Sequence, residues 1–279
     1  MPGPMVLQDL IRYRELLMQF VRRDISLRYR QAIMGFGWAV LLPLLTMGAS
    51  LVLRAIAFKG GSAGAPPVAA LAVKAWAWGF IAGALTFGSQ SLLSNISLVT
   101  KIYFPREVLP VAAILTQCVD GAIGFAVLAI ALPFLSGRVG LAVLWFPPFM
   151  LLLVAVVLGL TLLLAAANIF YRDVKYIVQV FLTFGIFFTP VVYDPSSFHG
   201  VARALVMANP FAGILVGMDL SLTRNLDLLT THLVLTQKGT MGVLWQPTDL
   251  IAPLIGAPLL LVGGLYLFRR ASAWFAEVY

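Results

Sequence analysis

The chain has 279 residues; 61% are hydrophobic, only 11% are charged, and the formal net charge is +8. A soluble domain carries about 25% charged residues, so these values exclude a soluble fold and predict an integral membrane protein. The basic residues lie at the ends of apolar stretches, where membrane orientation requires them. The positive charge therefore does not indicate a nucleic-acid partner.

Residues 5–33 are predicted to form a helix that lies along the membrane surface, and we call it the interface helix. Most of its apolar residues fall on one arc at helical spacing, and basic residues dominate the rest. Four arginines stand close to the first apolar stretch: Arg22, Arg23, Arg28 and Arg30. Two interpretations stay open, an anchor that only fixes orientation and a docking element for a cytoplasmic partner.

Six stretches are long and apolar enough to cross a membrane, which takes about 20 residues of helix. They are residues 31–53, 75–100, 108–137, a part of 139–171, 176–193 and 250–268. The predicted fold is therefore an all-α integral membrane protein of one domain, 1–279, with a six-span bundle over 34–268.

An outer segment, residues 198–248, is predicted to enter the membrane without crossing it. Asparagine is a good N-cap and proline is favoured at the first helical position, so one helix ends near Ala208, and Asn209 caps another that begins at Pro210. Each half is too short to cross. A re-entrant pair on one side fits better than a seventh span, and such backbone must be buried in protein or line water.

The distribution of lysine and arginine predicts the orientation. With six spans both termini lie on one side, and that side carries the larger and denser group of basic residues. By the positive-inside rule the termini, including the tail 269–279, face the cytoplasm.

Asp120 lies near the middle of the third predicted span. An intramembrane carboxylate usually faces protein or water, so Asp120 is a proton site, a substrate contact or a structural hydrogen-bond partner of a neighbouring helix. No second buried charge is apparent from the sequence, which argues against a proton relay.

Aromatic residues are dense at two places. At 74–80 the letters KAWAWGF fit an interfacial belt at the outer end of the second span. In the fifth span Phe181, Phe184 and Phe188 form one stripe. Packing or lipid contact is the ordinary explanation; the alternative is a pore lining for a sugar polymer, with Tyr193 and Trp38 as further candidates.

No catalytic or metal motif is present: the chain has no G-x-x-x-x-G-K-[ST], no H-E-x-x-H and no G-x-S-x-G. We therefore expect no catalytic residue, no metal and no cofactor on this chain. Any ATP hydrolysis belongs to another subunit.

Several motifs, taken in order, resemble one known family. The first runs over Arg23, Asp24, Ile25, Arg28, Tyr29, Met34, Gly35, Trp38 and Pro43; the others are KIYFPREVLP at 101–110, FYRDVKYIVQVFL at 170–182, FFTPVVY at 187–193, ANPF at 208–211 and FRRASAWFAEVY at 268–279. The chain resembles the permease subunits of type-2 ABC exporters for O-antigen, capsular polysaccharide and teichoic acid. One departure is 223–241, which is longer than the usual connection.

This resemblance implies a homodimer with two separate ATP-binding subunits, which carry the ATP and Mg. It implies that a coupling helix between spans two and three contacts the ATPase through Lys101, Tyr103, Phe104, Pro105, Arg106 and Glu107. It also implies a function: export of a lipid-linked polysaccharide, on a polyprenyl pyrophosphate carrier, across the bacterial inner membrane. The four arginines of the interface helix would lie near the carrier phosphates, although anchoring to membrane lipid explains them equally well. A type-2 exporter of a drug or small lipid and an ATP-independent secondary transporter are the alternatives.

Overall fold

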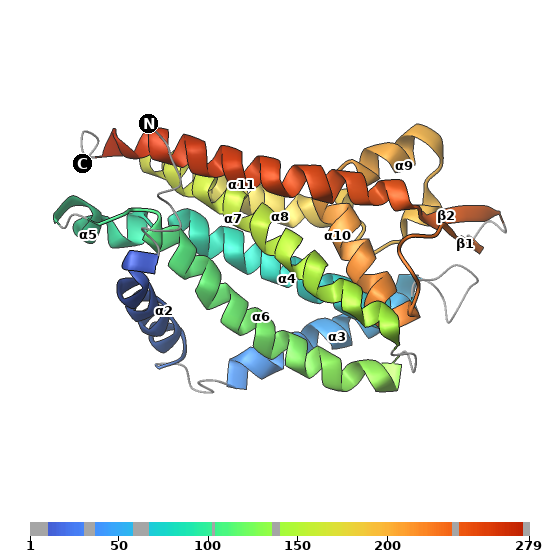
Figure 1. Ribbon diagram of the computed structural model, residues 1–279. Helices are drawn as coiled ribbons and strands as arrows, with labels where there is room; N and C mark the ends of the chain where they lie inside the picture. The colour runs from blue at the N-terminus through green and yellow to red at the C-terminus, as the bar shows by residue number, and fades with distance from the viewer. Residues whose placement is uncertain are drawn as a thin grey trace.

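The structure is a computed structural model, and it describes residues 11–30, 37–57, 67–101, 104–135, 140–235 and 240–275. Its helices and strands are α2 (Arg14–Tyr29), α3 (Gly37–Ala57), α4 (Val68–Gln90), α5 (Ile96–Lys101), α6 (Val108–Leu135), α7 (Phe146–Phe170), α8 (Val174–Phe188), α9 (Gly200–Met207), α10 (Pro210–Asp219), β1 (His232–Leu235), β2 (Met241–Trp245) and α11 (Ile251–Ser272). Short turns join them: η1 (Leu93–Asn95), η2 (Leu141–Trp145), η3 (Pro195–Ser197), η4 (Leu220–Arg224) and η5 (Pro247–Leu250). Figure 1 shows these elements as one elongated helical bundle.

Four helical stretches of the described chain have the length and apolar composition of membrane spans: Val68–Gln90, Val108–Leu135, Leu141–Phe170 and Pro247–Ser272. The predicted first and fifth spans correspond to α3, with 21 residues, and to α8, with 15. A helix the length of α8 is about 22 Å long, shorter than a hydrocarbon core of about 30 Å. The structure therefore supports an all-α membrane protein, while the count of six crossings stays a prediction.

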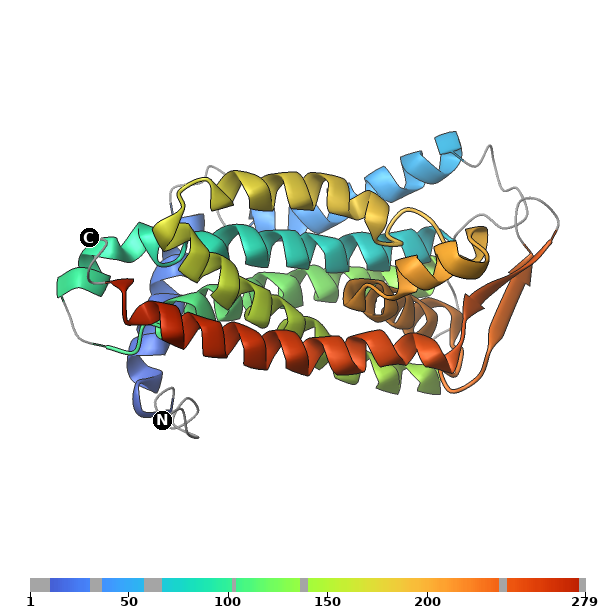
Figure 2. The same ribbon diagram turned by 90° about the horizontal axis from the view of Figure 1, so that it is seen from above.

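The helix α4 occupies the centre of the bundle. In Figure 2 it runs through the middle, with α8 on one side and α7 and α11 on the other. Its small residues let its neighbours approach closely, and its large side chains Phe80, Ile81 and Leu85 are buried. Between α7 and α11 the backbones meet directly, because a Cβ on Gly159 or on Gly264 would overlap the backbone of the opposite helix.

The second predicted span is displaced from its true position. The helix begins at Val68 and ends at Gln90, not at 75 and 100, and the chain continues through η1 into the short helix α5. The predicted start of this span, at residue 75, was wrong because a charged residue such as Lys74 normally marks the end of a span. In the structure Lys74 is fully buried and ion-paired, so it lies inside the helix.

The interfacial belt predicted at 74–80 is also wrong. Trp76 and Trp78 are buried in the core, and the Trp76 Nε1 atom donates a hydrogen bond to the carbonyl oxygen of Gly121, 3.1 Å away on α6. A tryptophan N–H that leaves water needs such a partner. The Trp76 ring therefore joins α4 to α6, whereas the Trp78 ring lies against Gly185 of α8.

The outer segment follows its predicted break. α9 and the helix that begins at Pro210 are bent by 90°, and the Asn209 side chain accepts a hydrogen bond from the backbone N–H of Phe211 at 3.0 Å. The predicted N-cap at Asn209 is confirmed. Whether the pair is re-entrant in a membrane stays a prediction.

The unusually long connection at 223–241 contains an element that the all-α prediction missed. β1 and β2 form an antiparallel hairpin in which Leu235 pairs with Met241 and His232 with Trp245. Alternating β-branched and large apolar residues favour such strands. Residues 236–239, between the strands, lie outside the described residues.

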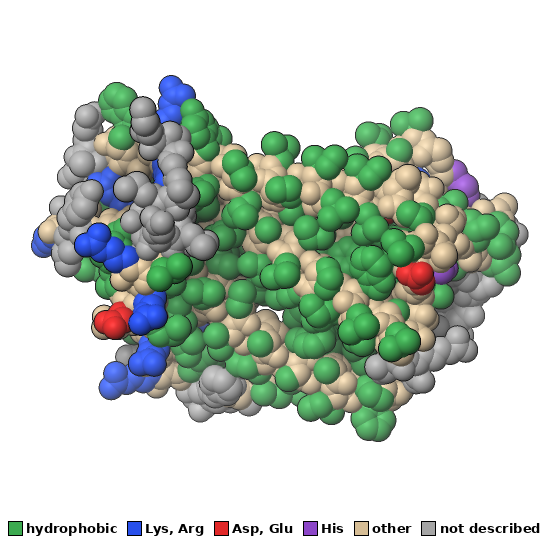
Figure 3. All heavy atoms as spheres, viewed as in Figure 1, with side chains coloured by type: hydrophobic (Ala, Val, Ile, Leu, Met, Phe, Trp, Pro, Cys, Tyr) green, Lys and Arg blue, Asp and Glu red, His purple; other side chains and the backbone are tan. Residues whose placement is uncertain are grey.

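The helix α2 and the C-terminal end of α11 lie at the same end of the bundle, as Figure 1 shows, and we call it the terminal end. It contains α2, α5 and the C-terminal end of α11, whereas the hairpin and α9 lie at the opposite, outer end. On the face shown in Figure 3, lysine and arginine gather at the terminal end, and apolar side chains cover the middle. This distribution agrees with the predicted orientation, which itself stays a prediction.

Candidate functional site

The segment after α5 is held against the interface helix by aromatic packing. Phe104 and Phe20 of α2 are both buried, and their ring centroids are 6.1 Å apart. Edge-to-face or tilted pairs at this distance contribute beyond their buried area. Of the predicted interface helix, residues 5–10 and 31–33 lie outside the described residues.

Arg106 and Glu107 attach the same segment to α11. The Arg106 guanidinium donates to the carbonyl oxygen of Ser272 and lies 5.5 Å from the ring centre of Phe275. From the other side, Arg269 Nε donates to Glu107 Oε1 at 3.0 Å. Residues 104–107 are therefore joined to both α2 and α11, and we call this assembly the terminal-end junction.

The structure places the predicted coupling residues in different surroundings. Phe104, Arg106 and Glu107 make contacts within the chain, so they position the segment. Lys101 is exposed at the end of α5, Pro105 is half-buried, and Tyr103 lies outside the described residues. Contact of this segment with an ATPase stays a prediction.

The four arginines of the interface helix have different environments. Arg28 forms an ion pair with Asp120, lies 3.5 Å from Gln117 Oε1 and stacks 4.2 Å from the ring centre of Phe87. Arg23 donates to Asp24 at 3.0 and 2.8 Å. Arg22 and Arg30 are exposed.

Asp120 thus joins α6 to the interface helix. Besides the ion pair, its Oδ1 accepts a hydrogen bond from the Tyr29 hydroxyl at 2.7 Å. Asp120 thus makes the structural hydrogen bond to a neighbouring helix that was one of its alternatives, and its role as a proton site or substrate contact stays a prediction. The expectation that no other buried charge is present is wrong, because a group of charges at the outer end, which includes Lys74, Asp194 and Asp219, is buried, and Arg28 is half-buried.

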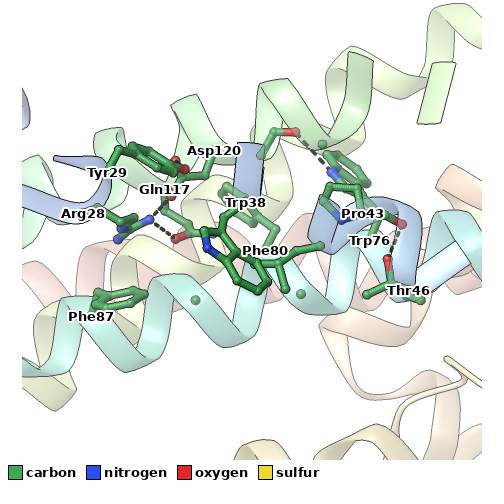
Figure 4. Close-up of a pocket in the computed structure, with 16 residues that line it drawn as sticks. Arg28, Tyr29, Trp38, Pro43, Thr46, Trp76, Phe80, Phe87, Gln117 and Asp120 are labelled. Carbon is green, nitrogen blue, oxygen red and sulfur yellow. Dashed lines mark hydrogen bonds and ion pairs between the residues drawn. The ribbon is translucent and has the colours of Figure 1, made fainter. Parts of the chain in front are cut away.

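A pocket of about 550 Å³ opens beside this ion pair, between α3, α4 and α6. Figure 4 shows Arg28, Tyr29, Gln117 and Asp120 at one end of it and the rings of Trp38, Trp76, Phe80 and Phe87 along its walls. We call it the apolar pocket. It has the size of ordinary ligand sites, about 300–1,000 Å³.

The predicted pore-lining residues do not come together within one chain. Trp38 lines the apolar pocket, to which α8 contributes no residue. Phe181, Phe184 and Phe188 lie exposed on α8, 47%, 56% and 74% accessible, and the Tyr193 hydroxyl donates to the carbonyl oxygen of Phe187 at 3.2 Å. A pore built from these rings therefore requires a second chain, and the lining role stays a prediction.

A buried group of charges at the outer end was missed from the sequence, and we call it the outer ion network. Lys74 Nζ is 2.9 Å from Asp194 Oδ1, Arg224 Nη2 is 2.8 Å from Asp194 Oδ2, and Arg224 Nη2 is 3.6 Å from Asp219 Oδ2. Burial raises the pKa of Asp194, but Lys74 and Arg224 outweigh it and hold that pKa below its ordinary value. The one signal in the sequence was Lys74 inside an apolar stretch; its partners lie more than a hundred residues away.

A second buried ion pair connects α9 to the base of the hairpin. Arg203 binds Asp249 with two bonds, of 3.2 and 2.5 Å, and Arg203 Nε donates to the carbonyl oxygen of Val243 at 3.1 Å. Among the described residues no three His, Cys, Asp or Glu side chains are placed to hold a metal.

Comparisons with known proteins give a consistent set of relatives. The chain is 29% identical over 216 residues to the O-antigen export system permease protein RfbA of Myxococcus xanthus, covering 75% of this chain and 81% of that protein. Two proteins of the same name from Klebsiella pneumoniae are 22% and 21% identical, over 72% and 81% of this chain and 78% and 89% of their own length. No model of a known protein family matches the chain.

Proposed function

We propose that the chain is the membrane subunit of an ATP-driven exporter of lipid-linked polysaccharide, of the type-2 ABC exporter family that its motifs resemble. Its similarity to O-antigen export permeases supports this proposal. The cargo is a glycan like O-antigen or teichoic acid on a polyprenyl pyrophosphate carrier, and it crosses the bacterial inner membrane. The similarity to three relatives over most of their length is the observation that carries this proposal.

The assembly we propose contains two copies of this chain and two cytoplasmic ATP-binding subunits that hold ATP and Mg. Two features support it. The chain has no phosphate-binding loop of its own, and the aromatic face of α8 is exposed when one chain is considered alone. Both termini then lie in the cytoplasm, on the side of the ATPase.

The terminal-end junction supplies the route by which ATP drives the motion. ATP binding closes the partner subunits against α5 and the segment after it. Phe104 packs on α2, and Arg106 and Glu107 hold α11, so a push on this segment moves both helices together. In this proposal the exposed Lys101 contacts the partner subunit.

A direct test is co-purification of the tagged chain from its native host. We expect an ATPase subunit and a second copy of the chain in the purified complex, identified by mass spectrometry and by the mass of the intact assembly. Recovery of the chain with no ATPase, while glycan export persists in cells depleted of ATP, would favour a secondary transporter instead.

A further inference from the structure

The hairpin of β1 and β2 has one face that is apolar and largely exposed. Directly opposite residues of two paired strands place their side chains on the same face, and the pairs Leu233–Val243 and Leu235–Met241 form this one. Leu233, Leu235 and Met241 are 53%, 55% and 58% accessible, and Val243 is half-buried. An antiparallel strand face that meets water usually carries polar residues. We call these four residues the hairpin face.

The hairpin lies beyond the membrane-spanning part of the chain. The helical stretch that follows it, Pro247–Ser272, has 26 residues and is therefore about 39 Å long, enough to cross a hydrocarbon core of about 30 Å. An open sheet edge does not occur inside hydrocarbon, because its unpaired backbone groups would find no partner there. The hairpin face therefore lies outside the hydrocarbon, where an exposed apolar patch marks a contact with another molecule.

One edge of the hairpin is open. The edge along β2 is covered, because the Arg203 side chain of α9 donates to the carbonyl oxygen of Val243 and β2 packs against η3. Among the described residues β1 forms backbone hydrogen bonds only with β2. Its residues 232–235, HLVL, include no lysine or proline of the kind that protects an edge strand. Such an edge is a template for pairing with another chain.

The small size of the hairpin face indicates what kind of partner covers it. Four side chains bury far less than the area of about 800 Å² per partner that is typical of a stable protein interface. The hairpin face therefore does not hold a separate protein by itself, and its partner must be a chain that a second contact keeps nearby. A contact that is linked in this way acts at a high effective concentration and needs little area.

The direction of the hairpin selects a second copy of this chain as that partner. Figure 2 shows that the hairpin starts beside α11 and runs across the outer end of the bundle, toward the side that carries α8. The exposed aromatic face of α8 is where the proposed two-copy assembly places the second chain. In a dimer with a two-fold axis, each surface patch of one copy meets the same patch of the other. Two hairpins that extend toward the axis therefore approach each other.

We propose that the hairpins of two copies pack on each other at the outer end, along β1 and through the hairpin face. Leu233 and Leu235 then lie beside their counterparts in the second copy. This inference rests on the two-copy assembly proposed above and adds a contact to it. Residues 223–241 are the part of the chain that departs from the family pattern, so the resemblance implies nothing about this contact.

Cysteine cross-linking of the full chain in membranes of its native host tests the contact. Cys118 is the only cysteine, so Cys118→Ala is the background, into which Leu233→Cys, Leu235→Cys or the control Val201→Cys is introduced alone. Val201 is 76% accessible on α9, at the same end of the bundle. A disulfide needs Cα atoms within about 7 Å of each other. We expect mild oxidation to join two chains through Leu233→Cys or Leu235→Cys at least about tenfold faster than through Val201→Cys.

A charged substitution in the hairpin face provides a second test. Leu235→Lys places like charges opposite each other across the two-fold axis, which opposes association, so we expect it to slow cross-linking through Leu233→Cys about tenfold. Leu229→Lys is the matched control, because Leu229 is 62% accessible and precedes β1, outside the hairpin face. We expect this control to leave cross-linking unchanged. Equal rates in the two lysine variants would contradict the packing of one hairpin face on the other.

Co-purification of two differently tagged copies from the same membranes separates this contact from the assembly itself. If the copies co-purify and neither hairpin cysteine cross-links faster than Val201→Cys, the hairpin contact is overturned and the export proposal stands. Quenching of a fluorophore on Leu235→Cys by nitroxide lipids would then assign the hairpin face to the membrane surface. Copies that do not co-purify contradict the two-copy assembly, and the hairpin contact with it.

Discussion

At the scale of single residues, the most informative feature is that charges inside the bundle are paired. Lys74 is fully buried and contacts Asp194, which also binds Arg224. A buried ion pair contributes little net stability, but removal of one partner leaves an uncompensated charge and is strongly destabilising. The outer ion network therefore fixes α4, the segment before α9 and the end of α10 relative to one another.

Replacement of Lys74 by methionine tests this network. We expect the Lys74→Met chain to lose about 3 kcal/mol of unfolding free energy, at the lower end of the usual range because Arg224 still faces Asp194. The double variant Lys74→Met, Asp194→Asn is expected to recover part of the loss. Lys175→Met, which removes an exposed lysine, serves as the control and is expected to change stability by less than about 0.5 kcal/mol.

Unfolding in detergent, followed by tryptophan fluorescence or by SDS titration, measures these differences. If Lys74→Met and Lys175→Met unfold alike, the network has no stabilising role.

At the scale of elements, the interface helix is attached to the bundle at two places. Arg28 and Tyr29 bind Asp120 of α6, and Phe20 packs on Phe104 in the terminal-end junction. These contacts join α2 to α6 and to the segment after α5, both of which lie far from α2 in the sequence. The interface helix is therefore packed against the bundle, and docking of a cytoplasmic partner on it stays a prediction.

The coupling segment makes a prediction at the same scale. The double variant Phe104→Ala, Arg106→Ala removes a buried ring and the hydrogen bond to Ser272. Loss of the ring lowers the free energy of unfolding by about 3 kcal/mol. In the assembled transporter we expect ATP hydrolysis to continue while export falls about tenfold, which corresponds to 1.36 kcal/mol in the barrier. Export and ATPase rates are measured together at matched expression.

Arg270→Ala is the control for that pair, because Arg270 lies exposed at the same end of α11. Export and hydrolysis that stay coupled in the double variant would exclude the proposed role of the junction.

Element-scale features were also the part of the fold that the sequence predicts best. Apolar stretches located α3, α6, α7, α8 and α11, and Asn209 with Pro210 located the break between α9 and α10. Partners that lie far apart in the chain were not predictable. Lys74 was assigned to the membrane boundary because Asp194 and Arg224, which make its burial possible, are brought to it only by the folded bundle.

The candidate site shows the same limit. Motif order located the junction residues but did not predict that Phe104, Arg106 and Glu107 contact α2 and α11; their contact with an ATPase stays a prediction. A pattern of residue types does not reveal whether a side chain points toward a partner protein or toward another helix of its own chain, when both could offer charged partners. The hairpin was missed because its strands are short and one contains Gly242, which weakens a strand pattern.

At the scale of the whole molecule, the feature that bears on assembly is the exposed aromatic face of α8. Phe181, Phe184 and Phe188 are exposed along one helix of the bundle, and α8 contributes no residue to the apolar pocket. We propose that two chains place these faces about a common path, where sugar C–H groups pack on the rings.

Replacement of two of these rings tests the path. We expect Phe181→Ala with Phe188→Ala to slow polymer export several-fold while leaving unfolding stability nearly unchanged, because both side chains are exposed in the single chain. Tyr176→Ala with Phe187→Ala is the matched control, because both are exposed aromatic residues of α8 and, at about 3.6 residues per turn, lie outside the face that carries the stripe. If the Phe181→Ala, Phe188→Ala variant exports at the wild-type rate, the stripe does not line the path, and lipid contact or packing explains it.

The central claim is ATP-driven movement of a lipid-linked glycan, and reconstituted vesicles test it most directly. The chain and its ATPase partner are placed in proteoliposomes loaded with fluorescent lipid-linked glycan, and protection of the glycan from an external glycan-degrading enzyme is followed over time. The account predicts that added ATP moves the glycan into the protected interior, and that an ATPase subunit with an altered phosphate-binding lysine abolishes this movement. Movement at the same rate without ATP, or with the inactive ATPase subunit, would contradict it.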